Sequence, residues 1–344
     1  MNVTMIIDLQ FGSTGKGLIA GYIAERDQPD CVVNANMPNA GHTYINDEGR
    51  TWIHKVLPNG IVSPKLKYVL IGPQSVFSLE QLRKEYSDSA DIMEKVQLVI
   101  HENAMVLTAA HKEMEQAALS GISSTMQGSA AASIEKMMRN PKYDGRAKTQ
   151  LIGTEFQECL ADHVTYQTIM QSCNLVLAEG AQGYSLGLNA GFWPYCTSRD
   201  CTPQRFLADM GIPLRGLDLT VIGTCRVHPI RVGNTPDGYS GDWYPDQEEI
   251  TWEEIGIEAE LTTVTKRPRR IASWSWHQIV DALNDCDPDE IFLNFCNYDQ
   301  EEAISIASKI PEIAYMGYGA KRCDIVEVAN TGGNITVIGG AKHG

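Results

Sequence analysis

The sequence predicts an α/β protein whose mainly parallel central sheet is flanked by helices. Short apolar runs typical of buried strands alternate with stretches whose apolar residues recur at helical spacing. Such alternation is typical of parallel sheets covered by helices. Polar, glycine-containing segments directly follow several of the strand-like runs, and open α/β sheets bind their ligands at that position. We therefore expect the functional site at the carboxyl ends of the strands.

The expected elements cover most of the chain. Strands are predicted at residues 3–9, 31–36, 51–56, 68–71, 96–100, 175–178, 219–224 and 291–295. Helices are predicted at residues 18–26, 78–86, 107–119, 130–139 and 274–283. No internal repeat or low-complexity linker divides the chain, so residues 1–344 are expected to form a single domain. Residues 234–260 are acidic, aromatic and turn-rich, which indicates an excursion or flap on that domain.

Composition excludes several classes of partner. The formal net charge of −15 argues against binding to nucleic acid or to an anionic membrane surface, both of which need a basic protein surface. No apolar run approaches the roughly 20 residues that a membrane span requires. The nine cysteines show no paired framework and no secretory leader is recognised, so we expect a cytoplasmic protein, in the host cell if a phage encodes it.

A glycine-rich segment from Gln10 to Gly17 joins the first predicted strand to the first predicted helix. Its backbone N–H groups and the helix dipole favour a bound phosphate, and Lys16 adds a positive charge. The spacing differs from a standard P-loop, because only two residues separate Gly12 from Gly15. A tight turn with a solvated lysine is the alternative, since glycine is common wherever the backbone is strained.

Two further loops carry candidate catalytic side chains. His42 lies among small and polar residues after the second predicted strand, where it is either a donor to developing negative charge or a surface imidazole without a role. Gln182 follows the strand predicted at 175–178 and is flanked by Gly180 and Gly183. It could contact an amide or oxo group of a ligand, or bond only to nearby backbone.

Hydroxyl-rich and basic segments complete the set. Residues 123–125 and 195–198 precede predicted helices, and for each segment taken singly helix capping is favoured over phosphate binding. The segment 262–270 combines threonines with Lys266, Arg267, Arg269 and Arg270 in an acidic chain. Arginine binds carboxylates bidentately, so a dicarboxylate would suit this loop. A solvated basic loop is the alternative.

The order of these motifs resembles that of the adenylosuccinate synthetases, which condense aspartate with the 6-oxo position of a purine nucleotide at the expense of a nucleoside triphosphate. The matching segments are residues 10–17, 39–43, 54–61, 124–128, 179–183, 195–198 and 262–270. The resemblance implies three groups of binding residues. At the triphosphate they are Gly12, Ser13, Thr14, Gly15, Lys16, Gly17, Gly41, His42, Thr43, Asn294 and Asn297. At the purine monophosphate they are Ser13, Asn39, Ser124, Thr125, Arg139, Gln182 and Thr197, and at aspartate Thr262, Thr263, Val264, Arg267 and Arg269.

The resemblance also implies a mechanism. The purine oxo group would take the γ-phosphate, and the amine of aspartate would then displace the resulting 6-phosphoryl group, with positioning and electrostatics supplying most of the catalysis. His42 would act as acid toward the departing bridging oxygen, and Gln182 would stabilise charge at the 6-oxygen. The Gly41 carbonyl and Ser13 would hold Mg²⁺. Arg139 would reach the site from the other subunit of a homodimer.

Ser13 departs from the family pattern. In ordinary members this position of the glycine turn carries an aspartate that removes the purine ring proton, and an unactivated serine is a poor base. A shorter hydroxyl side chain leaves room for a 2-amino group and can accept its hydrogen bond, which points to a guanine nucleotide. The change resembles the bacteriophage branch of the family, the 2-aminoadenylosuccinate synthetases, which act on dGMP on the way to diaminopurine DNA.

A second departure concerns the triphosphate. The family's Thr-Lys-x-Asp pattern, whose acidic residue pairs with guanine, is replaced here by the segment from Asn294 to Asn297. An asparagine amide can both donate to and accept from adenine, so ATP or dATP is the expected phosphate donor. The alternatives are an ordinary adenylosuccinate synthetase acting on IMP and a non-catalytic nucleotide-binding protein.

Overall fold

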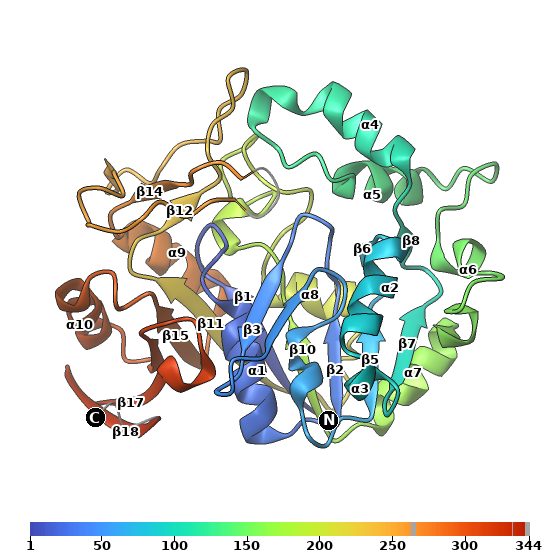
Figure 1. Ribbon diagram of the computed structural model, residues 1–344, viewed down its shortest axis with the longest axis horizontal. Helices are drawn as coiled ribbons and strands as arrows, with labels where there is room; N and C mark the ends of the chain where they lie inside the picture. Colours follow the sequence, from blue (N-terminus) through green and yellow to red (C-terminus); the bar gives the residue numbers. More distant parts are fainter. Residues whose placement is uncertain (263–265, 332, 341–344) are drawn as a thin grey trace.

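A broad, mainly parallel sheet forms the centre of the computed structural model, which describes residues 1–262, 266–331 and 333–340 (Figure 1). Within these residues the sheet has eleven strands in the order β18-β17-β16-β15-β11-β1-β10-β2-β5-β7-β9. Neighbouring strands run parallel except at β16–β17 and β17–β18. The predicted fold class, a mainly parallel sheet flanked by helices, is confirmed.

The elements have the following bounds. The strands of the central sheet are Asn2–Asp8 (β1), Cys31–Asn34 (β2), Tyr68–Ile71 (β5), Gln97–His101 (β7), Leu160–Ala161 (β9), Leu175–Glu179 (β10), Asp218–Arg226 (β11), Glu290–Asn294 (β15), Ile313–Gly317 (β16), Ile325–Thr331 (β17) and Asn334–Gly340 (β18). The smaller sheets pair His42–Ile45 (β3) with Thr51–His54 (β4), Val76–Phe77 (β6) with Met105–Val106 (β8), and Arg270–Ala272 (β14) with both Ile230–Arg231 (β12) and Glu249–Ile250 (β13).

The α-helices are Lys16–Asp27 (α1), Leu79–Asp88 (α2), Ala90–Met93 (α3), Ala109–Ala118 (α4), Ser129–Met138 (α5), Ala147–Gln150 (α6), His163–Ser172 (α7), Pro203–Met210 (α8), Trp276–Cys286 (α9) and Gln300–Lys309 (α10). Short 3₁₀ turns cover Asn59–Val62 (η1), Ser120–Ile122 (η2), Gln157–Cys159 (η3), Tyr184–Leu186 (η4) and Arg322–Asp324 (η5). The described helices include none with the length and apolar character needed to cross a membrane.

Two apolar clusters lie on the two faces of the sheet. One face packs against α1, α2 and α3, through side chains such as Ile19 and Leu82. The other packs against α7, α8, α9 and α10, through side chains such as Tyr166, Phe206 and Ile279. Because both faces are covered, the central strands are buried along most of their length, which explains why they are continuous apolar runs instead of alternating patterns.

Most predicted elements are present. The structure differs from the prediction at the strand expected at 51–56 and at His42. The strand predicted at 51–56 forms as β4, but it pairs antiparallel with β3 in a separate hairpin. His42 was expected in a loop and is instead the first residue of β3, which no apolar run announces. Helices α7, α8 and α10 and the last three strands were not predicted.

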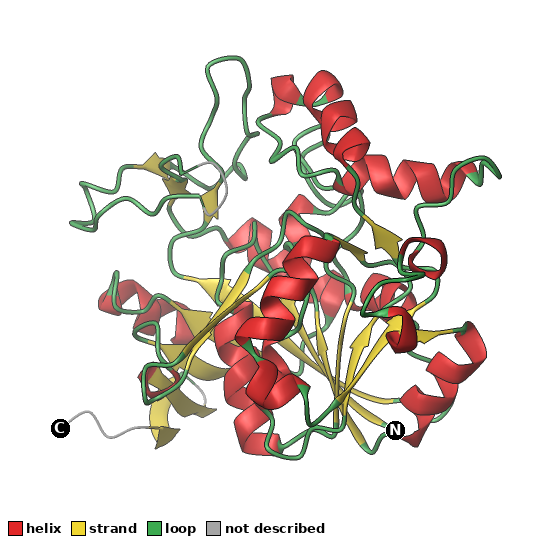
Figure 2. Ribbon diagram, turned by 45° about the vertical axis from the view of Figure 1, so that its right-hand side comes forward, coloured by secondary structure: helices red, strands yellow, loops and turns green. Residues whose placement is uncertain are grey.

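The strand order brings five carboxyl ends together. The five strands that lie side by side in the sheet are β2, β10, β1, β11 and β15. They are adjacent although β10 and β15 follow β1 in the chain by more than 150 residues. The α4–α5 pair and the β12–β14–β13 sheet both lie beyond this end (Figures 1 and 2). Residues 234–260 include β13, and the prediction that they act as a flap remains a prediction.

Candidate active site

A pocket of about 580 Å³ opens at these carboxyl ends. Eighteen of the predicted site residues line it: Gly12, Ser13, Thr14, Gly15, Lys16, Gly17, Asn39, Gly41, His42, Thr43, Ser124, Thr125, Gln182, Thr262, Arg267, Arg269, Asn294 and Asn297. They come from the segments that follow β1, β2, β10 and β15, from the segment between β13 and β14, and from the α4–α5 connection. The pocket therefore lies at the edge of the sheet where the site was expected, and the roles of these residues stay predictions.

The glycine turn adopts a left-handed backbone over several residues. The φ angles are 89° at Gly12, 55° at Ser13 and 97° at Gly15, and α1 begins immediately afterwards with no side chain capping its N-terminus. A Cβ on Gly15 would lie 2.1 Å from Nδ2 of Asn294, so another residue would not fit there. The turn thus leaves the first N–H groups of α1 available to an anion.

Lys16 is buried and held by Asp8, a residue that the sequence analysis did not single out. The Lys16 ammonium lies 2.7 Å from Oδ2 of Asp8 and 2.6 Å from the carbonyl oxygen of Gln182. The Asp8 carboxylate also accepts from the backbone N–H groups of Gln10 and Gly12 and from the Thr14 hydroxyl. The alternative of a solvated lysine is wrong. A carboxylate at the end of an apolar strand was the available signal, because a buried charge needs partners.

Arg226, at the end of β11, holds the turn from the other side. Its fully buried guanidinium donates to the Ser13 carbonyl at 3.2 Å and to both carboxylate oxygens of Glu260, at 2.5 and 3.2 Å. The Tyr298 hydroxyl donates to the same carboxylate. Burial by itself raises the pKa of Glu260, but Arg226 and Tyr298 more than offset this and keep the pKa below its usual range. The turn backbone is therefore fixed by a charged pair.

The imidazole of His42 is buried beside a carboxylate. Its Nδ1 lies 3.5 Å from Oε2 of Glu179, while Oε1 of Glu179 accepts from the backbone N–H of Gly60. A Cβ on Gly17 would approach the Thr43 backbone to 2.7 Å, so this glycine allows α1 to pack against the strand that carries His42. The surface-imidazole alternative is wrong, because the side chain is only 6% exposed and lies beside a buried carboxylate.

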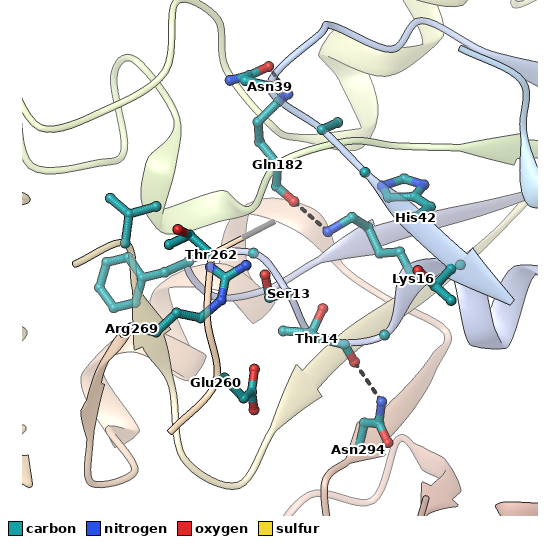
Figure 3. Close-up of a pocket in the computed structure, with 18 of the residues that line it drawn as sticks. Ser13, Thr14, Lys16, Asn39, His42, Gln182, Glu260, Thr262, Arg269 and Asn294 are labelled. Atoms are coloured by element: carbon teal, nitrogen blue, oxygen red, sulfur yellow. Dashed lines mark hydrogen bonds between the residues drawn. The ribbon is translucent and has the colours of Figure 1, made fainter. Parts of the chain in front are cut away.

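Gln182 is bonded to side chains, so the alternative of a glutamine bonded only to backbone is wrong. Its Nε2 donates to Oδ1 of Asn39 at 2.9 Å, and its Oε1 accepts from Nε and Nη2 of Arg199 at 3.2 and 3.0 Å. Figure 3 shows Gln182 beside Asn39 and near Lys16. Both candidate catalytic side chains, His42 and Gln182, therefore lie above the glycine turn.

The basic loop divides into two parts. Arg267 and Arg269 line the pocket together with Thr262. Arg270 points elsewhere, because it is bonded to Glu249 and to the Gly241 carbonyl. Burial lowers the pKa of Arg269, with Arg226 nearby acting in the same direction. The predicted contacts of Thr263 and Val264 lie outside the described residues.

The two asparagines of the segment after β15 differ in availability. The Asn294 amide donates to the Thr14 carbonyl and accepts from the Phe295 N–H, so both of its ends are bonded to backbone. Asn297 is exposed in the pocket. Asn294 therefore supports the glycine turn, and Asn297 is the asparagine of this segment that is free to contact a nucleotide base.

The remaining predicted residues differ in position. Ser124 and Thr125 line the pocket, whereas Thr197 and Arg139 do not. Helix capping by segments 123–125 and 195–198 is wrong, because the N-cap residues of α5 and α8 are Gly128 and Thr202. Arg139 is exposed at the end of α5, so its predicted role across a subunit interface remains a prediction.

Lys55 is a lining residue that the sequence analysis did not assign a role. It follows β4, and its backbone N–H is held by Glu85. Among the described residues no carboxylate lies within ion-pair distance of its ammonium, in contrast to Lys16. It therefore offers the pocket an uncompensated positive charge.

The fold and the pocket together define a nucleotide-binding α/β enzyme, with a buried histidine and a glutamine amide set above a glycine turn. The model of the family described as adenylosuccinate synthetase matches residues 5–165 and 142–297. The chain belongs to the adenylosuccinate synthetase family, whose members are carbon–nitrogen ligases.

Several curated relatives are similar over nearly the whole chain. The N6-succino-2-amino-2'-deoxyadenylate synthase of Vibrio phage phiVC8 is 51% identical over 348 residues, covering 94% of this chain and 97% of the relative. The enzyme of the same name from Cyanophage S-2L is 37% identical over 339 residues, covering 94% and 92%. The adenylosuccinate synthetase of Methanococcus aeolicus is 30% identical over 281 residues, covering 80% and 79%.

Solved structures agree with this assignment. The Cyanophage S-2L succinoaminodeoxyadenylate synthetase, bound to dGMP and to dATP as an energy donor, superposes with a TM-score of 0.89 at 37% identity and covers 95% of both chains. The adenylosuccinate synthetase of Plasmodium falciparum superposes with a TM-score of 0.76 at 18% identity, covering 95% of this chain and all of that one, and shows the shared fold.

Proposed function

We propose that this chain condenses L-aspartate with the 6-oxo position of dGMP, driven by ATP or dATP, and forms 2-amino-2'-deoxyadenylosuccinate for the synthesis of diaminopurine DNA. The observation that carries the proposal is Ser13. Its side chain is exposed in the pocket, its carbonyl is fixed by Arg226, and within the described residues its hydroxyl has no hydrogen-bond partner. The hydroxyl is free to accept from a purine 2-amino group. The names of the phage relatives support the same substrate.

The reaction is proposed in two steps. The purine 6-oxygen attacks the γ-phosphorus, the bond to the β,γ-bridging oxygen breaks, and His42 protonates the departing oxygen. The aspartate amine then attacks C6 and phosphate leaves. Gln182 donates to the 6-oxygen as it becomes charged, and Lys16 with the N–H groups of the turn holds the transferring phosphates. Ser13 is also proposed as the group that accepts the purine ring proton, because it occupies the position of the aspartate that removes this proton in ordinary members of the family.

The remaining predicted residues are proposed to contact the two nucleotides and aspartate. Asn39, Ser124, Thr125 and Thr197 are proposed at the monophosphate, with Arg139 supplied by the second subunit of a homodimer. Thr262, Thr263, Val264, Arg267 and Arg269 are proposed at aspartate, and Asn297 at the adenine of the donor. Residues 234–260 are proposed as a flap of a single domain. We place the enzyme in the cytoplasm of the host cell, which suits its nine free thiols, all of them within the described residues.

A magnesium ion fits the pocket if the substrate supplies most of its ligands. Among the described residues no cluster of three or more His, Cys, Asp or Glu side chains could hold a metal. The Gly41 carbonyl and the Ser13 hydroxyl are hard oxygen donors that line the pocket beside the turn. Mg²⁺ is commonly bound through few protein ligands together with substrate phosphates and water. Bound there, it would neutralise charge on the β- and γ-phosphates.

The test is phosphate release with Mg²⁺ and aspartate, comparing dGMP, GMP and IMP, each with ATP, dATP or GTP. Turnover with dGMP and little with IMP is expected, with either adenine donor. A Ser13→Asp variant should prefer IMP to dGMP. A Ser13→Ala variant should turn over dGMP less well than the parent and should still not turn over IMP. Turnover of the parent chain with IMP alone would make it an ordinary adenylosuccinate synthetase. The absence of purine-dependent phosphate release would make it a non-catalytic nucleotide-binding protein.

The shared site has a separate test. The variants Arg139→Leu and His42→Asn should each be inactive as purified. If Arg139 serves the other subunit, mixing them forms hybrid dimers with one intact site, and about a quarter of the parent activity should return, as random pairing of two subunits predicts. No recovery after subunit exchange would place Arg139 outside the partner's site.

A further inference from the structure

Arg199 is a buried arginine directly behind Gln182. It lies between η4 and α8, and only 2% of its surface is exposed. Its guanidinium makes four hydrogen bonds. Two go to Oε1 of Gln182, at 3.2 and 3.0 Å, one goes to the Ala35 carbonyl at 2.7 Å, and one goes to Oδ2 of Asp209 at 3.1 Å. The side chain thus connects the segment after β10 with the segment after β2 and with α8.

Further contacts hold this guanidinium in place. Asp209 is itself buried and also pairs with Arg205, whose Nε lies 2.7 Å from Oδ1. The Phe206 ring lies 5.2 Å from the Arg199 guanidinium carbon. Because a buried ion pair gains little stability over apolar residues of similar size, stability alone does not account for this arginine.

The contact determines which way the Gln182 amide faces. A guanidinium carries only N–H donors, so the amide atom that faces Arg199 must be the oxygen. The amide nitrogen then faces the opposite way, toward Asn39 and the pocket. One of its two hydrogens is donated to Oδ1 of Asn39, and the other remains for a ligand. The backbone of the same residue is fixed independently, because Lys16 donates to its carbonyl oxygen.

We propose that Arg199 is a positioning residue, which fixes the amide of Gln182 so that its free N–H points at the purine 6-oxygen. This inference rests on the proposed role of Gln182 in the proposed reaction. Without Arg199 the amide could rotate and present its oxygen, an acceptor, to a 6-oxygen that is gaining negative charge. The chain Asp209, Arg199, Gln182 and Asn39 therefore acts as a unit that is set before the substrate binds.

A double-mutant cycle tests the proposal. Arg199→Met, Gln182→Ala and the double variant are compared with the parent for kcat and for KM of dGMP, with folding checked by thermal melting. Arg199→Met is expected to lower kcat about 10- to 100-fold with little change in KM, as expected when a donor to a developing oxyanion is lost. In the Gln182→Ala background the same substitution should have almost no further effect on kcat.

Arg205→Met is the matched control. Arg205 is the second arginine on Asp209, its side chain is 43% exposed, and no hydrogen bond joins it to Gln182 within the described residues. The Arg205→Met substitution should leave kcat unchanged. If Arg199→Met does not fold, Arg199→Met with Asp209→Leu removes both buried charges together and should fold, because such exchanges are often neutral. Arg199→Lys, with a single ammonium, should restore part of kcat.

Two results overturn the proposal. The first is an additive cycle, in which Arg199→Met lowers kcat as much without the Gln182 amide as with it. The second is an unchanged kcat in a folded Arg199 variant. If the parent turns over IMP and not dGMP, the proposed substrate is wrong, but the cycle can be run with IMP because that purine has the same 6-oxo group. A parent that turns over no purine overturns both proposals.

Discussion

The two ends of the pocket differ in how their charges are balanced. At the glycine turn, Lys16 is paired with Asp8 and Arg226 with Glu260, so the protein itself supplies a counter-charge for both cations. At the basic loop, Arg267 has no carboxylate within ion-pair distance among the described residues. The turn is therefore assembled before any ligand arrives, whereas the loop offers charge that a dicarboxylate ligand would neutralise. Substitutions at the two ends should accordingly have different kinetic signatures.

The largest effect is expected from Asp8→Asn. It leaves Lys16 buried without a counter-ion, which should cost about 3–5 kcal/mol of unfolding free energy. Because the lysine and the turn would shift, kcat should fall about 100-fold or more. Urea unfolding and steady-state kinetics measure the two effects.

Asp30→Asn is the matched control for Asp8→Asn. Asp30 is another buried carboxylate that accepts from backbone N–H groups, those of Asn174 and Leu175, but it lies at the amino ends of the strands. The Asp30→Asn variant should lose about 1–3 kcal/mol of unfolding free energy and keep the kcat of the parent. An equal loss of kcat in both variants would mean that kcat does not depend specifically on the carboxylate at the glycine turn.

Next in size is the effect of Arg267→Met. Loss of a guanidinium that binds a carboxylate should raise the KM for aspartate about 10- to 100-fold with kcat changed far less. Arg270→Met is the control, because Arg270 belongs to the same segment but is bonded to Glu249 outside the pocket. A similar rise in the KM for aspartate in both variants would contradict the inference that Arg267 serves the pocket and Arg270 does not.

A smaller effect is expected from Lys55→Met. Because its ammonium is uncompensated and reaches the pocket, its loss should raise the KM for the nucleoside triphosphate by a few-fold, on the order of one charge–charge contact in a solvated cleft. The KM for aspartate should stay unchanged, which would place Lys55 at the phosphate end. Lys84→Met, at an exposed pair with Asp88 on α2, should change neither constant.

The smallest effect concerns stability and lies away from both ends. Burial and the neighbouring His163 lower the pKa of His101 from its ordinary 6.5 to about 4. The folded state holds this imidazole neutral, so its contribution is present above pH 6.5 and is lost as the pH falls toward 4. We expect a loss of about 1–2 kcal/mol over that range, with allowance for solvent screening. A His101→Asn variant should show a flatter pH profile of unfolding.

Local patterns predicted the parts of the site that are local in the chain. The apolar run before Gly12, the glycine spacing and the helix after Lys16 all lie within some twenty-five residues, and they form as expected. The approach of the other loops was also predictable, because segments that follow parallel strands meet at one edge of the sheet.

Partnerships between distant residues were not predictable from such patterns. Asn294 supports the carbonyl of Thr14, 280 residues earlier in the chain, and Arg226 joins Ser13 to Glu260. These contacts depend on strand order and register, which apolar periodicity does not encode. His42 was placed in a loop for a related reason, since the β3–β4 hairpin is short and stands outside the central sheet.

The hydrogen bond from Asn294 to the Thr14 carbonyl has a consequence for enzyme engineering. A designer who wished to change the phosphate donor from an adenine to a guanine nucleotide would be drawn to both asparagines of this segment. Replacing Asn294 would also remove a support of the phosphate turn and would confound selectivity with loss of activity. Libraries aimed at donor choice should therefore vary Asn297 and the other lining residues Gly319 and Ala320, and keep Asn294 constant.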